Sequence, residues 1–243
     1  MIRPSPRIQR LAEVLAGLVV LAGCAAHRAA APSPTVVDAV PGPAAIPPVA
    51  ARPRPEAHIA IRLGRVGHVV AAPDGTSDTN ADAIAGEIAK RTGFGLVVVS
   101  GSTGAAREVD ELYERRVLQA SQGPLRFYAE IHGSNRAQCA GQIEIATVGV
   151  DHELALRLRA LAELIRDAHL RTHDEIDRLA VLIEPVDPIP ERASGAKREG
   201  ILRLPERALH IELPRCARRD WREAYTAILA DFLAQAVALP SGR

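Results

Sequence analysis

The stretch "VVAAPDGTSDTNADAIAGEIAKRTGFGLVVVS" spans residues 69–100 and decides the fold. An apolar run, predicted as a strand over residues 67–73, ends at Pro73-Asp74-Gly75. A helical pattern follows, and its apolar positions share one face: Ala81, Ile84, Ala85, Ile88 and Ala89. Thr79 with Asp82 predicts a capping pair for this helix, and Gly93 predicts its C-terminal stop. The second apolar run, residues 95–100, is continuous, as in a strand covered on both faces.

The alternation of strands and helices continues to the end of the chain. Further strands are predicted over residues 125–133, 142–149, 179–186 and 208–214, and helices over 109–120, 151–170 and 221–239. The helix at 151–170 is expected to turn one apolar face inward: Leu154, Leu158, Leu161, Leu164 and Ile165. This order predicts an α/β domain with three layers, α/β/α, around a mainly parallel or mixed central sheet.

Length and charge exclude some classes of function. The chain has 243 residues, enough for one sizeable domain with a core of its own. Its 30 basic and 29 acidic residues give a net charge of +1, which argues against a nucleic-acid partner or a polybasic membrane-binding surface. Aromatic residues make up 3% of the chain, which also argues against base-stacking platforms.

Residues 1–24 are predicted to be an export signal. Arg3, Arg7 and Arg10 precede an apolar stretch too short to span a bilayer stably. The stretch ends in Leu21-Ala22-Gly23-Cys24, which resembles the lipobox of bacterial lipoproteins. The resemblance implies acylation of Cys24 as the mature N-terminus and an anchor in the membrane. The alternatives are an uncleaved anchor and an ordinary core helix.

Two further features bear on export. Ala25 after the cysteine resembles lipoproteins of the outer membrane, so we expect a lipid-anchored protein of the cell envelope that faces the periplasm. Residues 25–56 hold eight of the 18 prolines and predict an extended, disordered linker before a domain at 57–243. In an exported protein Cys139 and Cys216 could pair, but sequence separation alone leaves this open.

Four polar residues lie at or near predicted strand ends, where ligands bind in open α/β sheets. Asp74 and Asp78 follow the first strand, His132 ends "YAEIHG", and Glu212 lies inside the apolar strand "HIEL". Each has a simpler explanation. The two aspartates could serve a turn and a helix N-terminus, His132 could be a plain strand-end residue, and Glu212 could pair with an arginine. Together, however, they match a catalytic zinc site, which takes three protein ligands and a nearby proton acceptor.

Four short motifs, in the same order, resemble the N-formylglutamate amidohydrolase family. They are "PDGTSDTNADAIAGEIA", "REVDELYERR", "EIHG" and "HIEL", and the resemblance covers roughly residues 66–236. It implies the phosphorylase/hydrolase-like fold that this family shares with zinc carboxypeptidases. It also implies that a zinc ion takes part in catalysis.

The resemblance also implies a role for each matched residue. Asp74 stands where the family has its first histidine ligand, Asp78 on its acidic ligand and His132 on its second histidine ligand, while Glu212 stands on the general base. Arg107 with Arg115 or Arg116 would bind the carboxylate of the substrate, unless these are ordinary surface arginines. Aspartate in place of histidine at position 74 shifts the preference toward harder divalent ions and weakens affinity. The asparagine that the family has before the second arginine is also missing.

The sequence therefore predicts a lipid-anchored, metal-dependent hydrolase that cleaves an amide or peptide bond next to a free carboxylate. Zinc is the expected cofactor, with another divalent ion as the alternative. Two other functions stay open. A peptidoglycan amidase is one, although its usual Gly-His-Gly-Gly start and glutamate ligand are absent. The other is a binding or scaffold lipoprotein that keeps the fold without turnover.

Overall fold

The computed structural model describes residues 58–75, 77–101, 106–134, 141–190 and 193–240, with the side chains of 106–110 excepted. All of them belong to one compact unit, residues 51–243. The predicted signal sequence with Cys24 and the predicted linker lie outside the described residues. No helix within the described ranges is long and apolar enough to cross a membrane.

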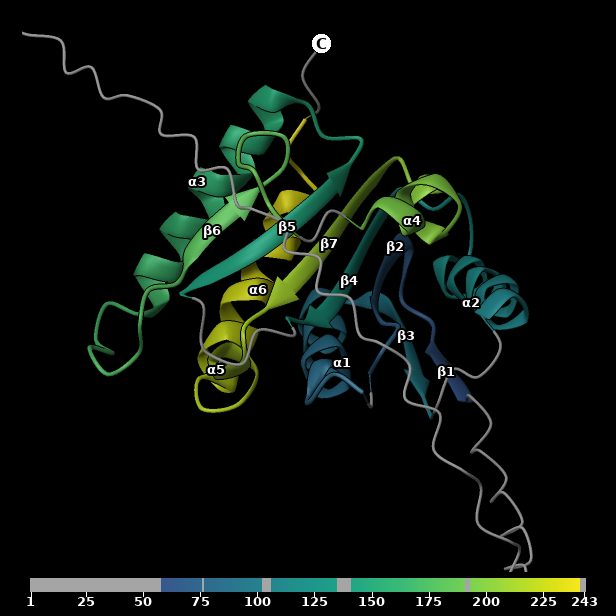
Figure 1. Ribbon diagram of the computed structural model, residues 1–243, viewed down its shortest axis with the longest axis horizontal. Helices are drawn as coiled ribbons and strands as arrows, with labels where there is room; N and C mark the ends of the chain where they lie inside the picture. The colour runs from purple at the N-terminus through teal and green to yellow at the C-terminus, as the bar shows by residue number, and fades with distance from the viewer. Residues whose placement is uncertain (1–57, 76, 102–105, 135–140, 191–192, 241–243) are drawn as a thin grey trace, which may run out of the picture. The chain divides into compact units, whose positions relative to one another are not determined.

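The described strands form one seven-stranded sheet, in the order β1-β3-β2-β4-β7-β5-β6 (Figure 1). Its strands are β1 (His58–Arg62), β2 (Arg65–Ala72), β3 (Phe94–Ser100), β4 (Phe127–Gly133), β5 (Gln142–Val148), β6 (Ala180–Ile183) and β7 (Arg207–Leu213). The four neighbours β3, β2, β4 and β7 are parallel, and β5 and β6 are parallel to each other. Antiparallel pairing joins β1 to β3 and β5 to β7. The predicted α/β class with a mixed, mainly parallel sheet is confirmed.

Helices cover both faces of the sheet and complete the three layers. They are α1 (Ala81–Thr92), α2 (Ala106–Ser121), α3 (His152–His169), α4 (Ser194–Arg198), α5 (Arg215–Arg218) and α6 (Arg222–Ala236), with a 3₁₀ turn η1 at Ile201–Arg203. One core cluster lies between the sheet and α1, α3 and α6. A second core cluster joins the opposite face to α2 and η1.

Helix α1 confirms the face predicted from its periodicity but not its capping pair. All five of its apolar positions are buried. Gly93 ends the helix with φ of 73° and donates its backbone N–H to the carbonyl oxygen of Ala89, as predicted. The Thr79–Asp82 capping pair is wrong, because Asn80 is the N-cap residue, with φ of 65° and no side-chain cap hydrogen bond.

Helix α3 begins with a side-chain cap that explains its start. The Asp151 carboxylate accepts a 2.7 Å hydrogen bond from the backbone N–H of Leu154. Leu154, Leu158 and Ile165 are buried as predicted and Leu161 is partly buried. Leu164 is 68% exposed, so its predicted inward position is wrong.

The parallel strands β2, β4 and β7 place their carboxyl ends at the same edge of the sheet. In the register between β4 and β7, Glu130 lies opposite His210 and His132 opposite Glu212. Residues two apart in a strand point to the same face, and so do residues directly opposite in neighbouring strands. These four polar side chains therefore share one face of the sheet.

Candidate metal centre

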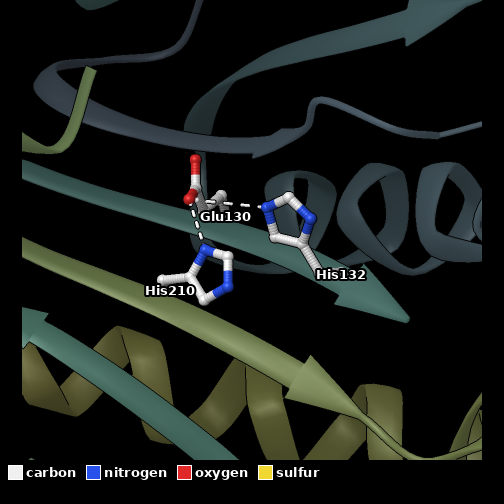
Figure 2. Close-up of side chains that lie close together, drawn as sticks. All are labelled: Glu130, His132 and His210. Carbon is white, nitrogen blue, oxygen red and sulfur yellow. Dashed lines mark hydrogen bonds and ion pairs between the residues drawn. The ribbon is translucent and has the colours of Figure 1, made fainter. Parts of the chain in front are cut away.

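Glu130 connects the two histidines of this face. Its Oε1 atom lies 2.5 Å from Nδ1 of His210 and 3.4 Å from Nε2 of His132 (Figure 2). Its Oε2 atom accepts a 2.9 Å hydrogen bond from the hydroxyl of Tyr128. His210 also contacts Glu212, with 3.1 Å between Nε2 and Oε1. The result is a polar network across two strands that are otherwise mostly apolar.

The loop after β2 adds two carboxylates to this network. The backbone of Asp74 makes the turn, because its carbonyl oxygen accepts hydrogen bonds from the N–H groups of Ser77 and Asp78. The side chains of Asp74 and Asp78, in contrast, point toward His132. Nδ1 of His132 lies 3.4 Å from Oδ2 of Asp74 and 3.9 Å from Oδ2 of Asp78. Oδ2 of Asp78 also accepts a 2.7 Å hydrogen bond from the backbone N–H of Gly133. The stretch is therefore a turn by its backbone and part of the site by its side chains.

Two groups of side chains in the described part of the chain have ligand atoms close enough to hold one metal ion. They are Asp74, Asp78 and His132, and Glu130, His132 and His210; in each group the ligand atoms lie within 4.8 Å of one another. The groups share His132 but use its opposite ring nitrogens. The structure thus brings the three predicted ligands together and adds a second group beneath them.

The donor set fits a divalent ion. In tetrahedral zinc sites with bonds of 2.0–2.1 Å, neighbouring donor atoms lie roughly 3.4 Å apart. The distances from His132 Nδ1 to Asp74 and Asp78, 3.4 and 3.9 Å, are close to that spacing without being short hydrogen bonds. The other nitrogen of His132, Nε2, is buried and makes no hydrogen bond. His132 is therefore surrounded by carboxylates that it contacts without a strong hydrogen bond to any of them.

Carboxylates dominate the electrostatics of both histidines. Burial alone lowers the pKa of His132, but contacts with Asp74 and Glu130 raise it to about 10. The pKa of His210 is also raised. Burial lowers it, but hydrogen bonds with Glu130 and Glu212 raise it by more. Burial raises the pKa of Glu130, yet the two imidazoles hold it well below its usual range. The pKa of Asp74 is lowered by His132, against burial. Without an ion, the carboxylates and the imidazoles therefore stabilise one another's charged forms.

A chain of hydroxyl groups supports Glu130 from the side of α2. The hydroxyls of Tyr113 and Tyr128 lie 2.6 Å apart, and Tyr128 donates to Glu130. Burial and the nearby Glu130 carboxylate raise the pKa of both phenols well above the ordinary value. Both tyrosines therefore stay neutral donors and fix the orientation of Glu130.

A pocket of about 730 Å³ opens above this network. Glu130, His132 and His210 lie on its floor, while α2 and the segment of α4 and η1 form its walls. The volume lies within the range of pockets for small molecules, roughly 300–1,000 Å³. A ligand bound there would touch the histidines directly.

The predicted arginines are not part of the described lining. Arg115 of α2 is exposed, and Arg116 donates from Nη1 to the side chain of Gln119 at 2.9 Å. Neither is among the residues that line the pocket. Arg107 also lies in α2, but its side chain is outside the described part. The carboxylate-binding role of these arginines stays a prediction.

Sequence reasoning missed Glu130 and His210, although a signal for them exists. In β4 a polar residue recurs at every second position of an apolar run, Glu130 and His132, and β7 repeats this with His210 and Glu212. A charge inside an apolar strand is costly unless it is paired. The argument that singled out Glu212 applies equally to these two residues.

Comparisons with known proteins give only distant structural likenesses. No protein-family model and no curated protein matches the chain. Among solved structures, the chain is similar to "YNDL-apo (Zinc-free)", with 15% identity, a TM-score of 0.49 and coverage of 73% of this chain and 89% of that one. It is also similar to a bacteriophage poly-gamma-glutamate hydrolase, with 14% identity, a TM-score of 0.46 and coverage of 75% and 88%. These likenesses leave the chemistry of the site to its own geometry.

Proposed function

We propose that this protein is a metal-dependent hydrolase that cleaves an amide or peptide bond at the carboxyl ends of β4 and β7, where His132 lies between the pocket and the two aspartates of the loop after β2. One observation carries the proposal. His132 faces Asp74 and Asp78 with one ring nitrogen and the buried Glu130 with the other. Metal-binding histidines commonly face a carboxylate with the nitrogen that does not bind the ion, and here Oε1 of Glu130 lies 3.4 Å from that nitrogen, close to it but not hydrogen-bonded.

In this proposal Asp74, Asp78 and His132 hold the ion, and Glu130 and His210 support them from below. The lower group is less suited to bind the ion itself. Its Glu130–His210 contact of 2.5 Å is a direct hydrogen bond, and the second oxygen of Glu130 is already engaged by Tyr128. Two carboxylates and one imidazole suit zinc, and also harder ions such as Mn²⁺.

The bound ion would supply Lewis acidity for the carbonyl and for the attacking water. The residues of the chain supply the proton transfer. Glu212 Oε1 is held by His210 Nε2 at 3.1 Å, and the described residues offer Oε2 no hydrogen-bond partner. Oε2 is therefore the atom that takes the proton of water and returns it to the leaving amine.

The finer parts of the proposal follow from the sequence. The scissile bond would lie next to a free carboxylate, which Arg107 and Arg115 or Arg116 would bind. The protein would act at the cell envelope, facing the periplasm, anchored through acylated Cys24. Both parts are supported by the resemblances in the sequence.

Zinc titration of the purified full-length chain tests the metal site. We expect one equivalent to bind and to raise the melting temperature, and a chelator to reverse the shift. Asp78→Asn should weaken zinc binding by more than about 100-fold, and His210→Gln by about 10- to 100-fold, as for a residue that orients a ligand. The reverse order would assign the ion to Glu130, His132 and His210 instead.

A matched control exists on the outer surface. His169 of α3 and Asp231 of α6 form a histidine–aspartate pair with 2.7 Å between Nε2 and Oδ2. His169→Gln should leave zinc affinity unchanged. Wild-type protein that binds no divalent ion would refute the metal site. A protein that binds zinc but hydrolyses none of a panel of N-acyl amino acids would fit the binding-lipoprotein alternative.

A further inference from the structure

Arg218 lies behind the metal centre and contacts three backbone segments at once. It belongs to α5, directly after β7, and is only 8% exposed. Its guanidinium donates from Nε to the carbonyl of Leu213 at 3.2 Å, from Nη1 to that of Thr79 at 3.1 Å, and from Nη2 to that of Ser134 at 3.4 Å. We name this guanidinium and its three carbonyl acceptors the Arg218 clamp.

Each carbonyl of the Arg218 clamp belongs to a segment that carries a residue of the site. Thr79 directly follows Asp78, Leu213 directly follows Glu212, and Ser134 comes two residues after His132. The three segments come from loops and strand ends far apart in the sequence. The planar fork of an arginine can fix several acceptors in a defined relative geometry, which a point charge cannot do.

Gly133 lets the guanidinium approach. A Cβ atom at this position would lie 2.5 Å from Cζ of Arg218 and 2.6 Å from its Nη1, so no side chain fits while Arg218 stays in place. The same glycine donates its N–H to Oδ2 of Asp78. The guanidinium therefore packs against the residue that holds one of the proposed ligands.

The segment of Arg218 is itself held in place. Asn80 donates from Nδ2 to the carbonyl of Arg218 at 2.7 Å, from a backbone with φ of 65°. Cys216 of the same short helix is disulfide-bonded, and the two other cysteines of the chain, Cys24 and Cys139, lie outside the described residues. Contacts in both directions thus connect the start of α1 with α5.

We propose that Arg218 is a positioning residue, which sets the distances among Asp78, His132 and Glu212 through the backbone carbonyls of the Arg218 clamp. The proposal rests on the metal site proposed above. Arg218 is buried and its three guanidinium nitrogens donate to backbone carbonyls, so it acts on the site through its neighbours and not on the substrate.

An effect of the Arg218 charge and an effect of the Arg218 clamp would change metal affinity in opposite directions when Arg218 is replaced. A fixed positive charge near the site repels a divalent ion, so removal of the charge alone would strengthen metal binding. Loss of the Arg218 clamp would weaken binding, because the ligands would no longer be held at the spacing that the ion requires. The sign of the change in affinity therefore separates the two effects.

The test compares Arg218→Met with Arg207→Met in the full-length chain. Arg207 is a matched control, because it is 9% exposed and donates to the carbonyls of Ala236 and Leu239 at the opposite end of β7. We expect Arg218→Met to raise the zinc dissociation constant about 10-fold or more. Arg207→Met should lower the melting temperature without changing zinc affinity. An unchanged or tighter zinc affinity in Arg218→Met would overturn the proposal.

Gly133→Ala provides a second test that does not depend on how well Arg218→Met folds. Its Cβ should displace the guanidinium and weaken zinc binding about as much as Arg218→Met. In the double variant the two effects should not add, because both act on one contact. Additive effects would contradict the proposed route through Gly133. Wild-type protein that binds no zinc would refute the metal site and, with it, this role of Arg218.

Discussion

The two ends of strands β4 and β7 show that the groups around a buried histidine, more than its burial, determine whether its pKa is raised or lowered. At the amino end, His68 of the neighbouring β2 is 9% exposed and lies beside the rings of Phe94 and Phe127. Burial lowers its pKa, against the carbonyl of Val66, and nearby arginines lower it further. At the carboxyl end, His210 is 8% exposed, yet hydrogen bonds with carboxylates raise its pKa.

The comparison shows that one end of a sheet can serve stability while the opposite end carries the reactive groups. The amino end contains packed rings and Arg207, whose guanidinium donates hydrogen bonds to carbonyls at and just beyond the end of α6. The carboxyl end contains acids and imidazoles beneath a pocket. Changes at the amino end should therefore affect stability, and changes at the carboxyl end should affect metal binding and turnover.

The largest effect is expected at the carboxyl end. Glu212→Gln should lower the hydrolysis rate by about 10²- to 10⁴-fold, because the amide cannot take the proton of water. Zinc affinity should stay the same, since Glu212 is not one of the proposed ligands. Turnover of N-acyl amino acids and zinc titration measure the two quantities. Glu206→Gln, an exposed acid just before β7, is the control and should leave both unchanged. Retained hydrolysis in Glu212→Gln would end its assignment as the base.

The next effect is expected at the amino end and concerns stability. Phe127 is 3% exposed, and its ring centroid lies 5.9 Å from that of Phe94. Phe127→Ala should lower the free energy of unfolding by about 3–5 kcal/mol, because it leaves a cavity between buried rings. Urea denaturation measures the loss. Folded protein should still bind zinc with wild-type affinity, and a large loss of affinity would show that the two ends are coupled.

The smallest effect is a pH dependence that comes from one group. The pKa of His68 is lowered in the folded protein, so the unfolded chain takes up a proton more readily as the pH falls. The stability contribution of neutral His68 is therefore present above the ordinary pKa of 6.5 and is lost as the pH falls through the lower, folded pKa. Unfolding of wild type and His68→Phe, compared from pH 8 to pH 5, should show the wild type losing more stability. Parallel curves would contradict the lowered pKa.

Local patterns in the sequence predict most of the fold, because they report which face of an element is buried. The five inward positions of α1 and the C-terminal stop at Gly93 follow from such patterns. Leu164 shows the limit, since a leucine at the edge of a helical face can remain exposed. Strand β1 was not predicted. Three of its five residues are exposed, two are partly buried and it pairs with β3 alone, so its apolar pattern is weak.

The site was less predictable because it depends on register. Asp74, Asp78 and His132 could be singled out one by one from strand ends. The pairing of Glu130 with His210 arises only when β4 and β7 become neighbours, at a sequence separation of 80 residues. No local pattern encodes that contact. The start of α1 likewise involves a distant contact, because the side chain of its N-cap residue Asn80 donates to the carbonyl of Arg218 in α5 instead of capping the helix.

The position of β7 in the sheet has a consequence for how the protein is made. β7 is the last strand of the described part of the chain, yet it lies between β4 and β5. During synthesis from the N-terminus, β4 therefore keeps an unpaired edge until residues 207–213 have been added. Over the same period Glu130 and His132 lack the residues that lie opposite them in β7, His210 and Glu212. When β7 is inserted, it joins β4 to β5 and brings Glu212 to the proposed metal site. A chain that ends before β7 therefore has the proposed ligands Asp74, Asp78 and His132 but no proton acceptor.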